Sequence, residues 1–181
     1  MFHYVYHPDA NHFNGVGLAP EDRDVTKVRT IDSPVHDRWA PIVVHGFPEN
    51  PGEDGDFPSL ADYNQLPIMS KRAWDILRPL VGYCCEPLPI IYPSGDPFFI
   101  IHVMETIDCL DPERSQVKRF SDGRIMRVFR YSFRQDMLVG KRIFKLPRQS
   151  AGELIVDDHF RAAVETNGLR GLIFKPVRTV E

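Results

Sequence analysis

The sequence predicts a single α+β domain with a mixed, mostly antiparallel sheet flanked by two or three helices. A chain of 181 residues that is 43% hydrophobic is long enough to bury one core. Short apolar runs between turn residues predict strands, and two stretches with helical spacing of apolar residues predict helices. The 16 prolines argue against long helices or a coiled coil, because proline interrupts a helix interior.

Few regular elements are expected in the N-terminal third. Residues 2–6 alternate aromatic and β-branched side chains and precede Pro8, which predicts a short first strand. Residues 9–33 are polar with weak periodicity, and residues 42–44 form a second apolar patch. Residues 47–67 contain four prolines, two glycines and several acidic residues, which together predict a long acidic surface loop.

Two helices have recognisable start signals. Ser70 is a favourable N-cap residue, and apolar residues follow it at helical spacing. Pro79 is expected to kink this first helix or to end it at the preceding residue. Asp157 or Asp158 is expected to cap the second helix, and Gly168 lies just past its predicted end.

Six apolar runs in the rest of the chain predict strands: 88–92, 98–107, 124–133, 143–146, 154–156 and 172–177. The first two flank the turn sequence Pro-Ser-Gly-Asp-Pro, which predicts a hairpin. The third follows an Asp-Gly turn and carries arginines along its length. Pro176 predicts that the last strand lies at a sheet edge, because proline has no N–H for a ladder.

The net charge of −3 predicts no particular partner, but the charges are unevenly distributed. No Lys or Arg occurs from Trp39 to Ser70, and this stretch contains five acidic residues: Glu49, Glu53, Asp54, Asp56 and Asp62. Residues 114–148 contain eleven basic residues against two acidic ones. Separated charges can steer a charged partner to one face. Alternatively, the two segments lie side by side in the fold and neutralise each other.

Sequence motifs for phosphate binding and hydrolysis are absent. Residues 15–20 begin like a dinucleotide-binding loop but end in Pro20 and lack the βαβ context, so a chance match is the better interpretation. The chain has no phosphate-loop lysine motif, no G-x-S-x-G and no H-E-x-x-H. We therefore expect no enzymatic activity and no cofactor.

A metal site is the first alternative. His3, His7 and His12 cluster near the N-terminus, and Cys84 and Cys85 are adjacent. A strand over residues 2–6 does not bring these histidines to one face, and adjacent cysteines lack the usual C-x₂₋₄-C spacing. We expect no metal site, and the odd number of cysteines does not suggest a disulfide framework.

A Cys–His hydrolase is the second alternative. Cys84, Cys85 or Cys109 would pair with His102 or His159. However, free cysteines mostly behave as small buried hydrophobes. His102 lies within an apolar strand, where a hydrogen-bonded core histidine is the ordinary explanation.

A nucleic-acid-binding or regulatory module that uses the basic 114–148 segment is the third alternative. Arg124, Arg127 and Arg130 alternate with aromatic residues, as they would on a surface that combines charge with base stacking. A pI near 6.2 argues against a dedicated nucleic-acid binder. Strand alternation also fits a core strand with a basic outer face, since it places on one side Ile125, Phe129, Tyr131 and Phe133.

The order of segments from residue 66 onward carries a resemblance. The segments read LPIMSKRAWDILRPL at 66–80, EPLP at 86–89, TIDCLD at 106–111, GKRIFKL at 140–146, IVDDHF at 155–160 and NGLRGLIFKPV at 167–177. This succession resembles the bacterial immunity protein 11 family over residues 66–177. Residues 1–65 match only loosely, as a variable N-terminal portion of one immunity-type domain spanning 1–181.

The resemblance implies a non-enzymatic, cytoplasmic antitoxin of a polymorphic toxin system that acts in bacterial competition. Its partner would be a cognate secreted toxin encoded nearby, and a nuclease is one candidate. For such a basic partner, the carboxylates of Glu49, Glu53, Asp54, Asp56 and Asp62 are the predicted contacts, because they mimic phosphates. No membrane association is expected, since no apolar run reaches the ~18–20 residues of a membrane span and residues 1–10 do not resemble a secretion signal. Whether the chain forms a homo-oligomer stays open.

Overall fold

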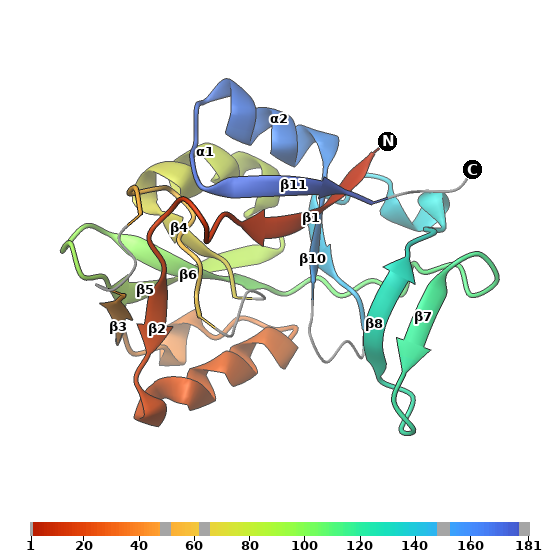
Figure 1. The fold of residues 1–181 in the computed structure, drawn as a ribbon, viewed down its shortest axis with the longest axis horizontal. Helices are drawn as coiled ribbons and strands as arrows, with labels where there is room; N and C mark the ends of the chain where they lie inside the picture. Colours follow the sequence, from red (N-terminus) through yellow and green to blue (C-terminus); the bar gives the residue numbers. More distant parts are fainter. Residues whose placement is uncertain (1, 48–51, 62–65, 148–152, 178–181) are drawn as a thin grey trace.

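In the described part of the chain, three β-sheets and two α-helices form an α+β fold with mostly antiparallel strand pairing, which confirms the predicted fold class (Figure 1). The computed structural model describes residues 2–47, 52–61, 66–147 and 153–177. The strands are divided among sheets of four, five and two strands, where the sequence predicted a single sheet. Apolar alternation identifies a strand but not its neighbour, so this division depends on tertiary contacts.

The four-stranded sheet joins the two ends of the chain. Its order is β11 (Leu172–Pro176), β1 (His3–Pro8), β10 (Leu154–Asp157) and β9 (Ile143–Lys145), and every pairing is antiparallel. The first strand of the sequence therefore lies between two of the last. β11 is an edge strand, as Pro176 predicted.

The five-stranded sheet has the order β2 (Val16–Leu18), β3 (Ile42–Gly46), β5 (Cys85–Ile91), β6 (Phe98–Val103) and β4 (Ile68–Ser70). β5 and β6 form the predicted hairpin, and the turn between them contains Gly95 at a φ of 80°. β3 pairs with β5 in parallel over only two positions, and the two strands separate beyond them.

The remaining sheet is a two-stranded ribbon of β7 (Gln116–Arg119) and β8 (Ile125–Arg130). The predicted Asp-Gly turn lies between them, with Gly123 at a φ of 82°. The register is irregular, because successive residues of β7, Gln116 and Val117, lie opposite Arg130 and Val128. Phe129 is the extra residue of this β-bulge.

Both α-helices begin with the predicted side-chain caps. Oγ of Ser70 accepts a hydrogen bond from the Ala73 N–H at 3.0 Å at the start of α1 (Lys71–Val81). Asp157 accepts from the Phe160 N–H at 2.9 Å at the start of α2 (Asp158–Thr166). Among the described residues, no helix is long and apolar enough to cross a lipid bilayer.

Helix α1 does not end before Pro79, as one form of the prediction had it, but continues to Val81. Pro79 is exposed, so the hydrogen bond that it cannot donate leaves a carbonyl that water can reach. Val81 is fully buried and anchors the last turn in the core. Burial of Val81 therefore outweighs the loss of one helical hydrogen bond.

The polar stretch 9–33 contains an element that its periodicity did not predict. The 3-10 helix η1 (Pro20–Thr30) buries only Val28 and is followed by η2 (His36–Arg38); a third such helix is η3 (Gln135–Leu138). The η1 segment is attached to the rest of the fold by hydrogen bonds: Lys145 donates to the carbonyl oxygen of Arg29 at 2.8 Å. Lys145 lies more than a hundred positions from η1 in the sequence, so local periodicity does not show this contact.

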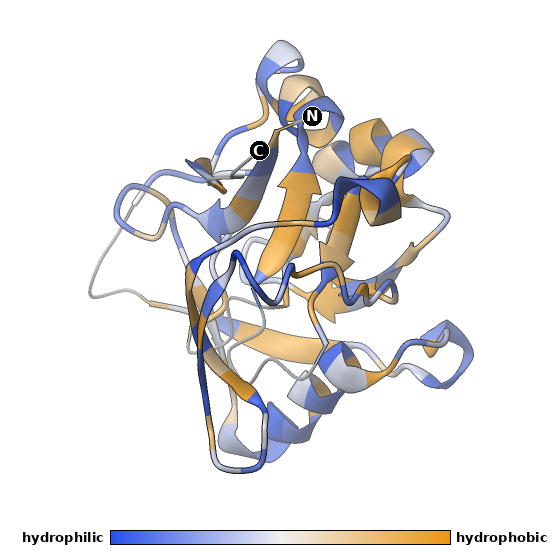
Figure 2. Ribbon diagram, turned by 90° about the vertical axis from the view of Figure 1, so that its right-hand side faces the viewer, coloured by the Kyte–Doolittle hydropathy of each residue, from blue (hydrophilic) through white to orange (hydrophobic). Residues whose placement is uncertain are grey.

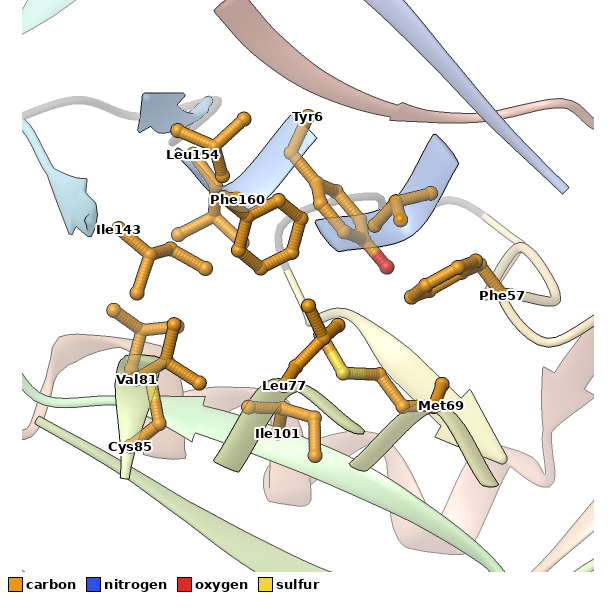
Figure 3. Close-up of a cluster of buried hydrophobic side chains, with 14 of the residues drawn as sticks. Tyr6, Phe57, Met69, Leu77, Val81, Cys85, Ile101, Ile143, Leu154 and Phe160 are labelled. Atoms are coloured by element: carbon orange, nitrogen blue, oxygen red, sulfur yellow. The ribbon is translucent and has the colours of Figure 1, made fainter. Parts of the chain in front are cut away.

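Side chains from both large sheets and both helices form the largest core. Figure 3 shows Met69, Leu77 and Ile101 facing Tyr6 and Phe160 across this core, and all of them are buried. In Figure 2 the strands inside the fold are mostly hydrophobic, the α-helices combine hydrophobic and hydrophilic residues, and many of the surrounding loops are hydrophilic.

The segment that was predicted to be a long surface loop is partly buried. Phe57 and Leu60 are 0% and 1% exposed, and the Phe57 ring packs edge-on against Tyr6 at 6.3 Å. In its described part, the segment has exposed residues at 52–54 and buried ones at 56–58, so the prediction of a surface loop along its whole length is not confirmed. Proline and glycine restrict the backbone path, but they do not indicate where the apolar side chains between them are buried.

Candidate functional site

A groove of about 550 Å³ lies where the N-terminal strands meet the turn between β5 and β6. We call it the acidic-rimmed groove, and its lining residues are Asn14, Gly15, Val16, Gly46, Phe47, Asp54, Tyr92, Pro93 and Ser94. Asp54 is the charged residue in this set, and most of the others present apolar surface. Such a combination of apolar walls and a few polar groups is typical of a binding site.

Phe47 and Tyr92 are the aromatic residues of the groove. Phe47 is 47% exposed, and the tip of its ring lies against β2, where a Cβ on Gly17 would be 3.0 Å from it. A Cβ on Gly15 would approach Ser59 Oγ to 2.5 Å. The two glycines therefore make room for Phe47 and Ser59, which explains the Gly-Val-Gly sequence without a dinucleotide.

A second depression adjoins the groove where β3 and β5 separate. It shares Gly46, Tyr92 and Pro93 with the groove and adds Val43 and Ile91. Val43 is 41% exposed and Ile91 is 54% exposed. These two side chains belong to paired positions of β3 and β5 and form an exposed apolar patch, a feature that often marks an interaction surface.

Two of the predicted contact residues, Glu53 and Asp54, are exposed; Asp54 lines the groove, and Glu53 precedes it in the chain. Oδ1 of Asp54 accepts a hydrogen bond from Nδ2 of Asn14 at 2.7 Å. The backbone of Glu53 bonds to that of His12 and Asn14, and its carboxylate forms an exposed ion pair with Arg170. The acidic rim is thus attached to residues 12–14 by its backbone.

Tyr92 and Asp54 influence each other electrostatically. Burial of the Tyr92 phenol, together with the negative charge of Asp54, raises the pKa of Tyr92 to about 12. Tyr92 therefore stays neutral at physiological pH. Its ring stacks on Phe98 with a centroid distance of 4.0 Å, which holds it in one orientation.

Asp56 has a different environment from its neighbours, since it is only 8% exposed. Its carboxylate accepts hydrogen bonds from Ser70 Oγ at 2.7 Å, from Arg72 Nη1 at 3.0 Å and from the Arg170 N–H at 3.0 Å. These contacts link the segment to the start of α1 and to the loop before β11. The other two predicted contact residues, Glu49 and Asp62, lie outside the described residues.

The acidic rim and the basic ribbon lie at opposite ends of the molecule. In Figure 1, β2 and β3 are at the left end and the β7–β8 ribbon is at the right end. Glu53 pairs with Arg170, and Asp56 pairs with Arg72. Neither arginine belongs to a charged segment. Basic residues of 114–148 pair with other acids, in Arg114–Asp111, Arg124–Asp122, Lys141–Glu105, Arg142–Asp157 and Lys145–Asp32.

The basic ribbon exposes one aromatic residue that was predicted to face the core. Ile125, Tyr131 and Phe133 are buried, but Phe129 is 61% exposed, with the Arg127 guanidinium 5.3 Å from its ring centroid. The prediction for Phe129 was wrong because the β-bulge at this residue breaks the two-residue alternation of the strand.

The candidate Cys–His residues have other partners. His102 is fully buried, with Nδ1 2.8 Å from Glu86 Oε1 and Nε2 2.8 Å from the Ile31 carbonyl oxygen, which confirms the predicted hydrogen-bonded core histidine. His159 contacts Asp157 and Arg142. The Sγ atoms of Cys84 and Cys85 face each other at 3.8 Å.

The thiols differ in acidity. Burial raises the pKa of Cys109 to about 12, and the hydrogen bond with Cys84 together with burial raises the pKa of Cys85 well above its usual value. The same hydrogen bond lowers the pKa of Cys84. Cys85 and Cys109 are therefore thiols at neutral pH and poor nucleophiles.

The N-terminal histidines are separated in the structure. His3 is buried against Phe133 and Phe144, whereas His12 is exposed and pairs with Asp9. Within the described part of the chain, no group of three or more His, Cys, Asp or Glu side chains is arranged to hold a metal ion.

The sequence indicated only the acidic rim of this groove. Phe47, Ile91 and Tyr92 each appear in it as ordinary residues at the end of a strand. They converge because β3 pairs with β5, a contact between residues about fifty positions apart. A local sequence pattern contains no signal for such a contact.

Comparison with known proteins identifies the family. A family model described as an immunity protein family (Imm11) matches residues 60–179. No curated protein matches the chain. The matched range includes Tyr92, Pro93 and Ser94 on one wall of the groove, whereas the other lining residues precede it. Because the match covers most of the chain, this protein belongs to the Imm11 immunity protein family.

Proposed function

We propose that this chain is a non-enzymatic immunity protein that binds a cognate toxin in the cytoplasm of the producing cell and blocks it. Family membership supports the role in immunity. The acidic-rimmed groove supports the binding site, because exposed Phe47 lines the same groove as the carboxylate of Asp54, and exposed Ile91 lines the depression that adjoins it. This juxtaposition of apolar patch and acidic rim is the observation that carries the proposal.

The two parts of the surface have different energetic roles. Burying exposed aromatic and aliphatic side chains such as Phe47 supplies most of the affinity in a protein complex. Charges at the rim mainly accelerate association with a partner of opposite sign. A basic toxin, for which a nuclease is our candidate, fits this acidic rim because its own ligand is polyanionic.

The five acidic residues contribute differently in this proposal. Glu53 and Asp54 contact the toxin directly. Asp56 does not contact the toxin but holds its neighbours Glu53 and Asp54 in position, since its oxygens already accept three hydrogen bonds. Glu49 and Asp62 add negative charge to the same stretch of chain and attract the toxin at longer range.

Co-expression with the toxin encoded beside this gene tests the function. The wild-type chain should rescue growth, and the purified proteins should form a stable complex. Failure of the chain both to rescue growth and to bind that toxin would refute the proposal.

Charge reversal tests the site. Glu53→Lys combined with Asp54→Lys should lower the association rate by roughly tenfold or more at low salt. Asp75→Lys combined with Glu165→Lys is the matched control, because it changes the net charge by the same amount at two exposed, ion-paired carboxylates that do not line the groove. Equal association rates for the two variants would remove the groove from the proposal.

A second candidate function is nucleic-acid binding by the basic ribbon. The observation in its favour is the exposed Phe129 with the Arg127 guanidinium over its ring, an arrangement that can stack an unpaired base. Titration of labelled single-stranded DNA and RNA at physiological salt separates the two candidates. The immunity function predicts negligible binding, whereas binding that Phe129→Ala and Arg127→Ala abolish would favour the second.

A further inference from the structure

The chemistry of the acidic-rimmed groove restricts what can occupy it. Asp54 is its charged residue, and among the described residues one oxygen of this carboxylate accepts a hydrogen bond from Asn14. A carboxylate has about four lone-pair sites, so Asp54 can accept further donors. A cationic group with several N–H donors can bind to these acceptor sites.

The aromatic lining restricts the shape of the cation. One face of Tyr92 is covered by Phe98, at a centroid distance of 4.0 Å and an interplanar angle of 20°, so only the other face is available to a ligand. Phe47 is the other aromatic residue of the lining. Rings of this kind attract a cation above their faces, and a planar guanidinium stacks on them better than a compact ammonium does.

The remaining lining suits an aliphatic stem. Pro93 is exposed and presents apolar surface next to the Tyr92 ring. A long side chain can therefore pack its methylene groups along the groove while its charged end reaches Asp54. Asp54 also acts on the Tyr92 phenol, so the carboxylate and the ring lie within electrostatic range of each other.

We infer that this groove receives an arginine side chain of the toxin, with the guanidinium paired to Asp54 and stacked on Tyr92. The inference rests on the proposed function and specifies the partner chemistry of the same site. An arginine satisfies the charge of Asp54, the flat aromatic face and the apolar stem site with one residue. Anchors of this kind often carry much of the affinity of an interface.

A small probe tests the groove without the toxin. Capped arginine (N-acetyl-arginine amide) is titrated into the full-length protein while the backbone amide signals of Gly15 and Gly46 are followed by NMR. These signals should shift saturably. Capped citrulline, which has nearly the same shape but no charge, should bind at least about tenfold more weakly, and capped lysine about threefold more weakly.

Two variants test whether Asp54 binds the capped arginine. Asp54→Asn keeps an oxygen for the hydrogen bond from Asn14, so the fold is retained, and it should weaken binding of capped arginine by about tenfold. Asp96→Asn is the control, because Asp96 lies on the turn between β5 and β6 that contributes Tyr92 to the groove but does not itself line the groove. It should leave binding of the probe unchanged.

Several results would overturn the inference. Equal shifts with citrulline or lysine would exclude guanidinium recognition, and shifts that depend on protein concentration alone would indicate that a second copy occupies the groove. The proposed function is judged separately by toxin binding. If the toxin binds normally and Asp54→Asn leaves its affinity unchanged, the arginine inference fails and the immunity function stands.

Discussion

His102 and Glu86 lie opposite each other on β6 and β5, and Nδ1 of His102 is 2.8 Å from Oε1 of Glu86. The other ring nitrogen, Nε2, faces the carbonyl oxygen of Ile31 at 2.8 Å. Both partners are hydrogen-bond acceptors, so the two ring nitrogens of His102 lie between a carboxylate and a carbonyl oxygen. Glu86 also accepts from the N–H groups of Val35 and His36. This buried pair therefore ties the segment after η1 to the sheet.

Removing one member of this pair should destabilise the fold strongly. His102→Leu leaves the Glu86 carboxylate and the Ile31 carbonyl without their partner, and we expect a loss of about 3 kcal/mol in the free energy of unfolding. Denaturant unfolding measures it. Combining His102→Leu with Glu86→Met removes the stranded charge and should recover part of the loss. A double variant no more stable than the single one would contradict this account.

Acid should weaken the same contact. Burial by itself would raise the pKa of Glu86, but hydrogen bonds from His102, Val35 and His36 outweigh it and hold this pKa below its usual range. The unfolded chain then takes up the proton first as the pH falls. The stabilisation is complete above about pH 4.3 and is lost as the pH falls through the lower folded pKa.

Unfolding free energies measured between pH 3 and 6 test this expectation. The curve should rise with pH more steeply for the wild-type chain than for Glu86→Gln, which cannot titrate at this position. Parallel curves for the two proteins would mean that Glu86 makes no such contribution.

His3 should cost stability rather than provide it. Within the described residues neither of its ring nitrogens has a hydrogen-bond partner, although the residue is fully buried. His3→Leu removes these unsatisfied groups while keeping a similar volume, so we expect the free energy of unfolding at pH 7 to stay equal or to rise by about 1 kcal/mol. Thermal and denaturant unfolding measure the change.

The His3 variant should also alter the pH dependence. Burial lowers the pKa of His3, an effect that the charge of Asp157 partly opposes, so the unfolded chain takes up a proton before the folded one. Wild-type stability should therefore fall as the pH drops below about 6.5, and His3→Leu should reduce this fall. His12→Gln, at an exposed histidine, is the control and should behave like the wild type.

Asp56 and Asp54 should separate folding from binding. Asp56→Ala removes the acceptor for Ser70, Arg72 and the Arg170 N–H, and we expect a loss of about 2–3 kcal/mol in the free energy of unfolding. Asp54→Ala, at an exposed residue, should change stability by less than about 1 kcal/mol. Asp54→Ala should lower the affinity for the toxin more than Asp56→Ala does. Equal stability losses would contradict the assigned roles.

Much of the fold follows from local sequence signals. Ser70 and Asp157 cap their helices as predicted, because an N-cap needs only its own side chain and the next turn of backbone. Gly95 and Gly123 adopt positive φ angles in the predicted turns for the same local reason. His102 was recognised as a core histidine because it stands in an apolar strand.

The missed features depend on contacts between distant residues. The helix η1 has one buried apolar residue and is held by Lys145, more than a hundred positions later. Phe129 faces solvent because of a bulge that its strand pairing produces. Asp56 resembles Asp54 in the sequence, but only Asp56 meets the side chains and backbone that bury it.

The sequence by itself determined the two α-helices, the hairpin turns, the acidic stretch and the family to which the chain belongs. These depend on propensities and capping within a few residues, or on the order of whole segments. Only the tertiary structure decided which acidic residues are exposed and that Phe47, Tyr92 and Asp54 form one groove. Such a groove requires three separate stretches of chain to meet, and side-chain patterns do not specify how separate strands pair and where they diverge.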